Sequence, residues 1–360
     1  MEENNRSDAM ILVYVVGILV CSLGGLVWFI GQPAIIAARR DRIVSVTEDE
    51  AVDAHATNVV LSIVVPAYNE KDRLPVMLTS ALDHLARHSS EITDQCCLLQ
   101  EQQQQKAKNG IVTRSHAAIG SKKPTAIIEV LVVSDGSTDD TAGVVRRFQA
   151  QQKIRKDGIV IRLLELSRNS GKGAAVQAGM LRTRGNVCLM ADADGATDFG
   201  PGITAVLKTY KELSEKQIRH IVVFGSRAHL EKASTATRSP LRSILMVCFH
   251  WFVAHLCDNT SIRDTQCGFK LFSRPAAMAL FTNLHLQRWA FDTELIVIVG
   301  KLTNTDCPFE LTEVSVPWHE VDGSKLDTSK FALAWNSITM LRDMICVRAC
   351  YYLGIWKLES

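Results

Sequence analysis

Short apolar runs alternate along this chain with polar loops and with segments of helical spacing. Each apolar run between residues 59 and 191 has the length of a buried strand. Four runs are predicted as strands: Val59 to Pro66, Ile127 to Val133, Ile159 to Leu166 and Val187 to Ala191. Helices are predicted between them: Leu74 to Leu85, a helix capped by Ser137 or Thr138, and Ala174 to Thr183. This alternation indicates an α/β domain with a doubly wound, mostly parallel sheet.

The longest apolar segment lies near the N-terminus, from Met10 to Ile30, and contains no charged residue. A helix of that length spans about 31 Å, which matches the hydrocarbon core of a bilayer. A cleavable signal peptide would need a basic leader and a shorter apolar core, whereas residues 1–9 are mainly acidic in charge. Arg39, Arg40 and Arg42 follow the segment, so the positive-inside rule places the rest of the chain in the cytosol. We therefore predict a single-pass transmembrane signal-anchor with a short lumenal tail at residues 1–9.

The rest of the chain divides into a linker, a main domain and a C-terminal segment. Residues 31–58 are predicted to be a linker, and residues 59–325 are predicted to form the α/β domain. A glutamine-rich, low-complexity insertion at about residues 89–124 interrupts this domain and is assigned to no element. Residues 326–360 are predicted to form amphipathic helices.

Two apolar segments beyond the predicted strands are interrupted by charged residues or histidines. They are Leu241 to Cys257 and Phe331 to Trp356, and both contain aromatic residues. We interpret them as helices lying in a membrane interface, with ordinary packing on the domain as the alternative.

The net charge and the cysteine spacing argue against a nucleic-acid-binding protein and against a disulfide-rich protein. The 360 residues carry a formal net charge of +2, so the charge balance does not indicate a nucleic-acid partner. The ten cysteines show no CxxC or metal-ligand spacing. This pattern is typical of free thiols in a reducing compartment rather than of a disulfide framework.

The strand that ends at Ala191 is followed by Asp192-Ala193-Asp194. Side chains two residues apart in an extended segment point the same way, so these carboxylates can converge on one cation. Mg²⁺ or Mn²⁺ suits the pair, because such ions accept one or two carboxylates and complete their coordination with substrate phosphates and water. Taken alone, an Asp-x-Asp sequence can also be a polar turn.

The loop at Gly171-Lys172-Gly173 opens the predicted helix after the third strand. Backbone N–H groups at a helix N-terminus favour anions, which indicates a diphosphate site. The loop lacks the upstream glycine and the following Ser or Thr of a P-loop, and its glycine spacing is not the dinucleotide fingerprint. We therefore predict a nucleotide site of another type.

Several motifs together resemble glycosyltransferase family 2, which has the GT-A fold. They are Val64-Val65-Pro66-Ala67-Tyr68-Asn69-Glu70, Asp135-Gly136-Ser137-Thr138-Asp139, Asn169-Ser170-Gly171-Lys172-Gly173 and Asp192-Ala193-Asp194. Residues 225–232, 262–272, 288–292 and 323–326 narrow the resemblance to the dolichyl-phosphate β-glucosyltransferases within that family. The resemblance extends from about Val59 to Leu358, apart from the glutamine-rich insertion.

The resemblance implies transfer of glucose from UDP-glucose to dolichyl phosphate, with inversion, at the endoplasmic reticulum membrane for protein N-glycosylation. The resemblance implies that Asp192 and Asp194 hold a metal ion, Mg²⁺ or Mn²⁺. It also places a set of residues around the nucleotide-sugar: Pro66, Tyr68, Glu70, Asp135, Lys172 and Asp192. Family members usually carry an aspartate at the position of Ser134, where it often contacts the uracil. Either Asp135 takes over that contact, or selectivity for uridine is weaker in this chain.

The acceptor side needs positive charge more than it needs a base. A phosphate monoester is already largely dianionic at neutral pH, so the nucleophile requires little deprotonation. The candidates for binding the acceptor phosphate are Arg227, Arg238, Arg242 and Lys325, of which Arg227 and Lys325 lie in the diagnostic motifs. Asp292 lies where relatives that glycosylate hydroxyl groups keep a catalytic base. It could orient the sugar or the acceptor, or form an ion pair with Arg288.

Two other function classes stay open at this point. One is another family 2 activity, either a mannosyl version or a transferase that acts on a hydroxyl group. The other is a membrane-anchored nucleotide-sugar-binding protein without activity. This alternative is considered because the chain has Ser134 where family members usually carry an aspartate.

Overall fold

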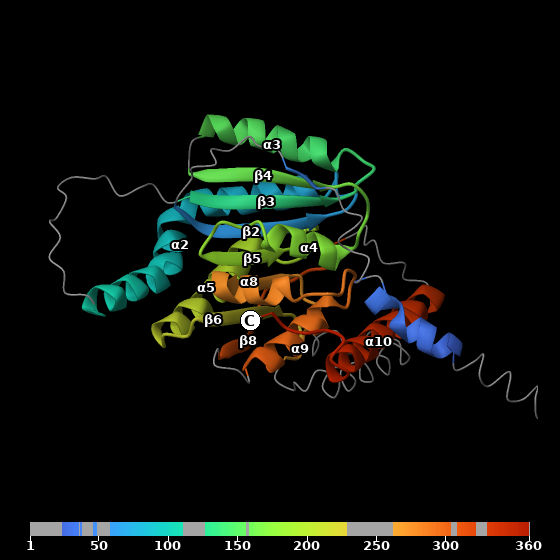
Figure 1. Cartoon of the computed structure of the whole chain (residues 1–360). Coiled ribbons are helices and arrows are strands. Elements are labelled where there is room, and N and C mark those ends of the chain that lie inside the picture. The colour runs from blue at the N-terminus through green and yellow to red at the C-terminus, as the bar shows by residue number, and fades with distance from the viewer. Residues whose placement is uncertain are drawn as a thin grey trace, which may run out of the picture.

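The computed structural model describes residues 24–35, 37, 46–48, 58–110, 127–155, 158–228, 262–303, 308–321 and 330–359 (Figure 1). A helix over residues 24–35 comes first. The elements that follow are β1 (Val46–Glu48), β2 (Val59–Ala67), α2 (Leu74–Gly110), β3 (Ile127–Asp135), α3 (Thr141–Arg155), β4 (Ile159–Leu166), α4 (Lys172–Met180), β5 (Val187–Ala191), α5 (Phe199–Glu215), β6 (His220–Ser226), β7 (Phe269–Ser273), α8 (Arg274–Thr282), α9 (Phe291–Thr303), β8 (Phe309–Ser315) and α10 (Lys330–Tyr352).

Within the described residues, the strands form one sheet in the order β1-β4-β3-β2-β5-β7-β6-β8. β2 runs parallel to β3 and β5, β3 runs parallel to β4, and β6 runs parallel to β8. β7 is antiparallel to both β5 and β6, and β1 is antiparallel to β4. This topology confirms the predicted mostly parallel α/β sheet. It also places the carboxyl ends of β2, β3 and β5 at the same edge.

Helices cover both faces of the sheet, and each face has its own apolar core (Figure 1). Leu78 of α2, Val145 of α3 and Tyr210 of α5 pack on one face. Phe281 of α8 and Val347 of α10 belong to the core on the opposite face, together with residues of α4 and α9. Because both faces are covered, the strands are apolar on both sides, which explains their continuous hydrophobic runs.

The structure corrects the prediction for the glutamine-rich segment. α2 continues as a helix through Gly110, with one non-helical residue at His88 (φ −116°, ψ 18°). Figure 1 shows its second half projecting beyond the sheet. Glutamine, glutamate, lysine and alanine are good helix formers, and a composition-based interpretation of residues 89–110 overlooked this propensity. Residues 111–126 lie outside the described part of the chain.

Two other boundaries also differ from the predictions. Residues 46–48, predicted as part of a linker, form β1, in which Val46 pairs with Leu166 of β4. α4 begins at Lys172 rather than Ala174 and ends at Met180 rather than Thr183. The Thr183 hydroxyl donates a hydrogen bond to the Met180 carbonyl (2.7 Å), so this side chain closes the helix end instead of extending the helix.

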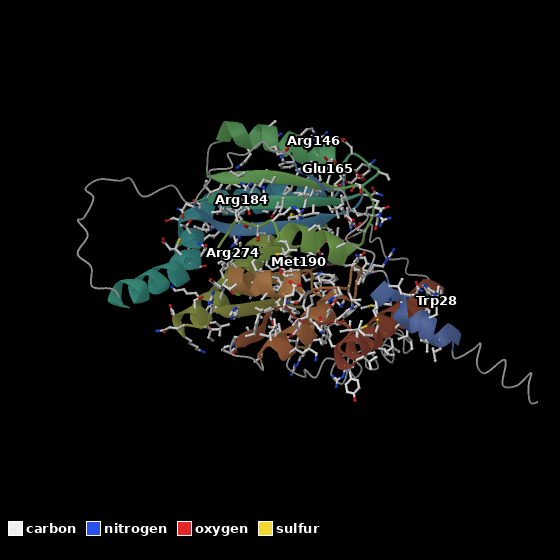
Figure 2. The ribbon with its side chains drawn as sticks, in the orientation of Figure 1. Trp28, Arg146, Glu165, Arg184, Met190 and Arg274 are labelled. Carbon is white, nitrogen blue, oxygen red and sulfur yellow. The ribbon has the colours of Figure 1, made fainter. Side chains whose placement is uncertain are left out.

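The helix over residues 24–35 lies beside α10 (Figure 1). The ring centroids of Phe29 and Trp335 are 6.5 Å apart, and the Arg342 guanidinium lies 5.2 Å from the Phe29 ring. Trp28 on the same helix is 64% exposed (Figure 2). Among the helices that the structure describes, none has both the length and the apolar character needed to cross a bilayer. Most of the predicted anchor, up to residue 23, and the whole segment 241–257 lie outside the described residues.

Candidate active site

A cavity of about 780 Å³ lies at the edge where β2, β3 and β5 end. In open α/β sheets, ligands bind at this edge. Residues that were predicted for the nucleotide-sugar, the metal and the acceptor meet around this one cavity: Pro66, Tyr68, Glu70, Asp135, Lys172, Asp192, Asp194 and Arg227. Three of the predicted acceptor residues, Arg238, Arg242 and Lys325, lie outside the described residues.

Asn69, which follows β2, ties two loops of the cavity together. It adopts a left-handed backbone conformation (φ 55°), which asparagine tolerates better than most residues. Its side-chain oxygen accepts hydrogen bonds from the backbone N–H groups of Thr138 (2.7 Å) and Asp139 (3.3 Å). The loop after β2 is thereby fixed to the loop after β3, and Tyr68 and Glu70 are held at the cavity.

Asp135, the last residue of β3, fixes the loop before α4. Its two carboxylate oxygens accept hydrogen bonds from the backbone N–H groups of Ser170 (2.7 Å) and Gly171 (2.8 Å). Burial raises the pKa of the Asp135 carboxyl, and these two hydrogen bonds oppose the rise. Gly171 has φ 103°, and a Cβ at this position would lie 2.5 Å from the Gln287 carbonyl oxygen. Only glycine therefore lets the loop pass this close to its neighbour.

Ser134, the departure from the family pattern, is 3% exposed. It pairs with Ala67 in the parallel β2–β3 ladder, and it is not among the described residues that line the cavity. Asp135, in contrast, both lines the cavity and holds the Ser170–Gly171 loop. Of these two adjacent positions, Asp135 is therefore the one at the cavity.

Lys172 and Asp192 form an ion pair on the cavity wall. The Lys172 ammonium lies 2.7 Å from Oδ1 and 2.8 Å from Oδ2 of Asp192, and 5.4 Å from the Trp289 ring centroid. Burial alone would lower the pKa of Lys172, but the carboxylates of Asp192 and Asp292 outweigh it and raise that pKa. Lys172 is therefore a permanent cation at the start of α4, beside the first of the two predicted metal ligands.

The donor set at Asp192 and Asp194 fits a hard divalent cation. Both carboxylates follow β5 and line the same cavity, and Oδ1 of Asp194 accepts a hydrogen bond from the Ala196 N–H (3.0 Å). A Cβ at Gly268 would lie 1.8 Å from Oδ2 of Asp192, so glycine leaves the space that this carboxylate occupies. Within the described residues, no group of three or more His, Cys, Asp or Glu side chains could hold a metal. A metal ion at this site would therefore complete its coordination with oxygens of the substrate phosphates and with water, as Mg²⁺ and Mn²⁺ commonly do.

Asp292, in the first turn of α9, forms an ion pair with Lys270 of β7 at 2.8 Å. Of the alternatives left open for Asp292, the ion pair with Arg288 is therefore wrong, and a direct role toward the sugar or the acceptor stays a prediction. Asp292 is 2% exposed and Lys270 is fully buried, so both lie behind the cavity wall. Burial raises the pKa of the Asp292 carboxyl, and the Lys270 charge opposes this rise. Arg288 lines the cavity instead.

Arg227, which follows β6, is held in place by Asp264. The Arg227 Nε and Nη2 donate to the two Asp264 oxygens at 2.7 and 2.8 Å, and the Arg227 backbone N–H donates to Oδ2 at 2.8 Å. The guanidinium also lies 5.5 Å from the ring centroid of Trp318. Burial alone would lower the pKa of Arg227, but its hydrogen bonds to Asp264 and the charge of that carboxylate raise it. The cavity thus contains a rigidly oriented cation.

Some cavity residues were not predicted: Arg73, Gln266, Arg288, Trp289, Trp318, Glu320, Ser337 and Met340. Arg73 lies three positions after Glu70, and its Nε donates to a Glu70 oxygen at 2.7 Å. That helical spacing could have identified it. Trp318 reaches the cavity through a β-bridge with Thr197, and no sequence pattern indicates such a long-range pairing.

Known proteins support the resemblance. The family model described as "Glycosyl transferase family 2" matches residues 112–281. The dolichyl-phosphate beta-glucosyltransferase of Homo sapiens is 40% identical over 300 residues, which cover 83% of this chain and 78% of that protein. The enzyme of the same name from Saccharomyces cerevisiae is 34% identical over 304 residues, which cover 83% of this chain and 77% of that protein.

Among solved structures, the glucosyl-3-phosphoglycerate synthase from Mycobacterium tuberculosis in complex with UDP is 14% identical, with a TM-score of 0.45. The alignment covers 81% of this chain and 80% of that one. Sequence identity of 34–40% over more than four fifths of the chain, together with the mostly parallel α/β sheet, is decisive for the family. This chain belongs to glycosyltransferase family 2, with a GT-A-like fold, and within it to the dolichyl-phosphate β-glucosyltransferases.

Proposed function

We propose that this enzyme transfers glucose from UDP-glucose to dolichyl phosphate, with inversion, and so supplies dolichyl β-glucosyl phosphate for protein N-glycosylation. The observation that carries the proposal is the 40% identity to the human dolichyl-phosphate beta-glucosyltransferase over 83% of the chain. The charges around the cavity agree with it, because both substrates bring phosphate groups.

The donor would occupy the side of the cavity formed by β2, β3 and α4. Pro66 and Tyr68 offer apolar and aromatic surface for the nucleoside. The loop held by Asp135 presents backbone and the start of α4 to the diphosphate. Asp192 and Asp194 would hold Mg²⁺ or Mn²⁺. When bound, such an ion supplies charge stabilisation for the departing UDP.

The acceptor phosphate would contact Arg227, whose orientation Asp264 fixes. An oxygen of the phosphate forms the new bond to the anomeric carbon while the bond from that carbon to the UDP oxygen breaks on the opposite face. This displacement inverts the configuration. The phosphate is already ionised at neutral pH, so the residues around it need to position it and to balance its charge rather than to remove a proton.

We also propose that the enzyme is anchored in the endoplasmic reticulum membrane through residues 10–30, with the catalytic domain in the cytosol. Exposed apolar side chains in and after α10 support the proposal that this side of the molecule faces the membrane. Each of these side chains is at least half exposed: Trp335, Ile338, Leu353 and Ile355. The same helix contributes Ser337 and Met340 to the cavity. An isoprenoid tail could then lie along this apolar side while its phosphate enters the cavity.

Purified full-length protein incubated with radiolabelled sugar nucleotides and dolichyl phosphate tests the proposal. We expect a glucolipid product from UDP-glucose, dependent on Mg²⁺ or Mn²⁺. Dolichol without its phosphate is the matched control and should accept no glucose. Transfer from GDP-mannose instead, or efficient transfer to the free alcohol, would contradict the proposal.

A further inference from the structure

Gln266 lies on the cavity wall and differs from the charged residues around it. Its Nε2 atom is buried and has no hydrogen-bond partner within the described residues. Asn186 and Tyr210 also have a buried polar atom without a partner in the described residues, but neither lines the cavity. The buried Oδ1 of Asp292 differs from these atoms, because it forms the ion pair with Lys270. A buried amide donor without a partner is costly, so a group that supplies an acceptor atom inside the cavity would be bound favourably.

The segment that carries Gln266 is fixed on both sides. Upstream, the Asp264 carboxylate binds Arg227, and its backbone N–H donates to Oε2 of Glu313 at 3.3 Å. Downstream, the Gly268 carbonyl accepts a hydrogen bond from the Asp192 N–H at 3.1 Å. The amide of Gln266 is therefore presented by a rigid backbone rather than by a free loop, which is the condition for discrimination between similar ligands.

These contacts also place Gln266 along the chain between the two charged parts of the site. Two residues before it, Asp264 contacts Arg227, the cation proposed for the acceptor phosphate. Two residues after it, Gly268 lies against Asp192, a proposed metal ligand at the donor diphosphate. The group transferred between these two phosphates is the sugar.

The chemistry of the side chain favours the sugar over either phosphate. An amide is neutral and offers both donors and an acceptor, which matches a hydroxyl group. The phosphates already have cationic side chains on the cavity wall, namely Arg73, Lys172, Arg227 and Arg288. We infer that Gln266 is a specificity-determining residue that hydrogen bonds to a hydroxyl group of the transferred hexose.

The inference rests on the proposed function, and it adds a residue to which that proposal gives no role. A site built to hydrogen bond a substrate hydroxyl rejects an analogue without that hydroxyl, because the protein group is then left unpaired. For one such bond we expect a loss of roughly tenfold to a hundredfold in kcat/KM.

The test compares the parent enzyme with Gln266→Met, which keeps the length of the side chain and removes the amide. Both are assayed with UDP-glucose and with the four UDP-deoxyglucoses that each lack one hydroxyl at carbon 2, 3, 4 or 6. The parent should lose kcat/KM strongly for at least one analogue. In Gln266→Met, that analogue and UDP-glucose should react with nearly equal kcat/KM. Gln95→Met, on α2 and away from the cavity, is the matched control and should behave like the parent.

Calorimetry gives a second readout that does not depend on turnover. Gln266→Met should weaken the binding of UDP-glucose and leave the binding of UDP unchanged. Equal weakening of both ligands, or a raised KM for dolichyl phosphate with unaltered UDP-glucose binding, would overturn the inference. If Gln266→Met does not fold, the parent series decides, because equal kcat/KM for all four analogues excludes a hydroxyl contact. A parent that binds UDP-glucose but transfers no glucose to dolichyl phosphate contradicts the proposed function, and the calorimetric comparison still tests Gln266.

Discussion

At the scale of single residues, the cavity is built from charged groups whose orientation is fixed by other groups. Asp135 accepts two backbone hydrogen bonds. Lys172 forms an ion pair with Asp192, and Arg227 forms one with Asp264. Polar groups fixed before a ligand arrives need little reorganisation when charge develops in a reaction. This arrangement suits the transfer of a sugar between two phosphates.

The first prediction at this scale concerns Asp194→Asn. The change removes one negative charge from the proposed metal site and keeps the shape of the side chain and its acceptor oxygen for the Ala196 N–H. We expect turnover to fall by at least a hundredfold, because a metal that balances leaving-group charge contributes several kcal/mol. Calorimetry should show weaker Mn²⁺ binding, while the thermal unfolding midpoint stays near that of the parent. Near-normal turnover in saturating Mg²⁺ would contradict the assignment.

A second prediction at this scale concerns the Arg227–Asp264 pair. Burial alone would raise the pKa of the Asp264 carboxyl, but Arg227 outweighs it and lowers that pKa. Because the folded-state pKa is lowered, the stabilisation is fully present above the unfolded pKa of about 3.9 and is lost as the pH falls through the folded pKa. Asp264→Asn should therefore reduce the free energy of unfolding by roughly 1–3 kcal/mol at pH 7. The difference from the parent should shrink below about pH 4.

Denaturant titrations of the parent and Asp264→Asn between pH 3 and pH 7 measure this difference. A difference that stays constant over the whole range would mean that the charge of Asp264 does not contribute to stability. The same variant should raise the KM for dolichyl phosphate more than the KM for UDP-glucose, since Arg227 loses its fixed orientation.

Residue types at strand ends were predictable from the sequence, and side-chain partners were not. Tyr68, Asp135 and Asp192 follow or end apolar runs, and the carboxyl ends of parallel strands meet at one edge. The partner of Asp292 illustrates the limit. Arg288 is one helical turn away in sequence, yet β7 supplies Lys270 as the actual partner. A buried ion pair depends on which strand passes beneath the helix, and local spacing carries no information about that.

At the scale of elements, the Lys270–Asp292 pair joins β7 to α9 inside the molecule. Lys270→Met would leave a buried carboxylate without its counter-charge, which typically costs about 3–5 kcal/mol. Lys270→Met combined with Asp292→Leu should recover part of that loss, because two apolar side chains leave no buried charge. Denaturant unfolding of the single and double variants measures both effects.

The matched control for this prediction is the exposed pair between Arg146 of α3 and Glu165 of β4 (Figure 2). The side chains of that pair are 50% and 33% exposed. Removing its arginine with Arg146→Ala should cost less than about 1 kcal/mol, because water screens a surface pair. If Lys270→Met costs no more than Arg146→Ala, the buried pair has no special role in joining β7 to α9.

The attachment of α10 shows what amphipathic patterning can and cannot predict. Residues 326–360 were predicted to form amphipathic helices, and the described part of that segment contains the helix α10 (Lys330–Tyr352). The amphipathic character stays a prediction. The pattern does not reveal how the C-terminal end is fixed. Glu294 of α9 accepts hydrogen bonds from the Tyr351 hydroxyl (3.2 Å) and the His285 backbone N–H (3.1 Å). The His285 ring stacks on Trp356 with centroids 4.1 Å apart. The Tyr351–Glu294 and Trp356–His285 contacts join residues more than fifty positions apart in sequence.

At the scale of the whole molecule, the cavity and the exposed apolar side chains adjoin each other. α10 contributes Met340 to the cavity and presents Trp335 and Ile338 to solvent. The helix over residues 24–35 lies beside α10 and exposes Trp28 (Figure 2). A lipid phosphate has a charged head and an apolar tail, and this arrangement offers a surface for each.

The last prediction concerns the orientation of the whole molecule in the membrane. Three arginines follow the apolar segment at residues 10–30, so the catalytic domain should face the cytosol. Ile111→Thr creates an N-glycosylation acceptor at Asn109, because it completes an Asn-Gly-Thr sequence that begins in the last two residues of α2. In microsomes this site should stay unmodified, whereas an acceptor site in an extension added before Met1 should be glycosylated. A shift in electrophoretic mobility that endoglycosidase reverses measures each outcome. Efficient modification at Asn109, with an unmodified N-terminal extension, would mean that the enzyme has the opposite orientation and takes its donor from the lumen.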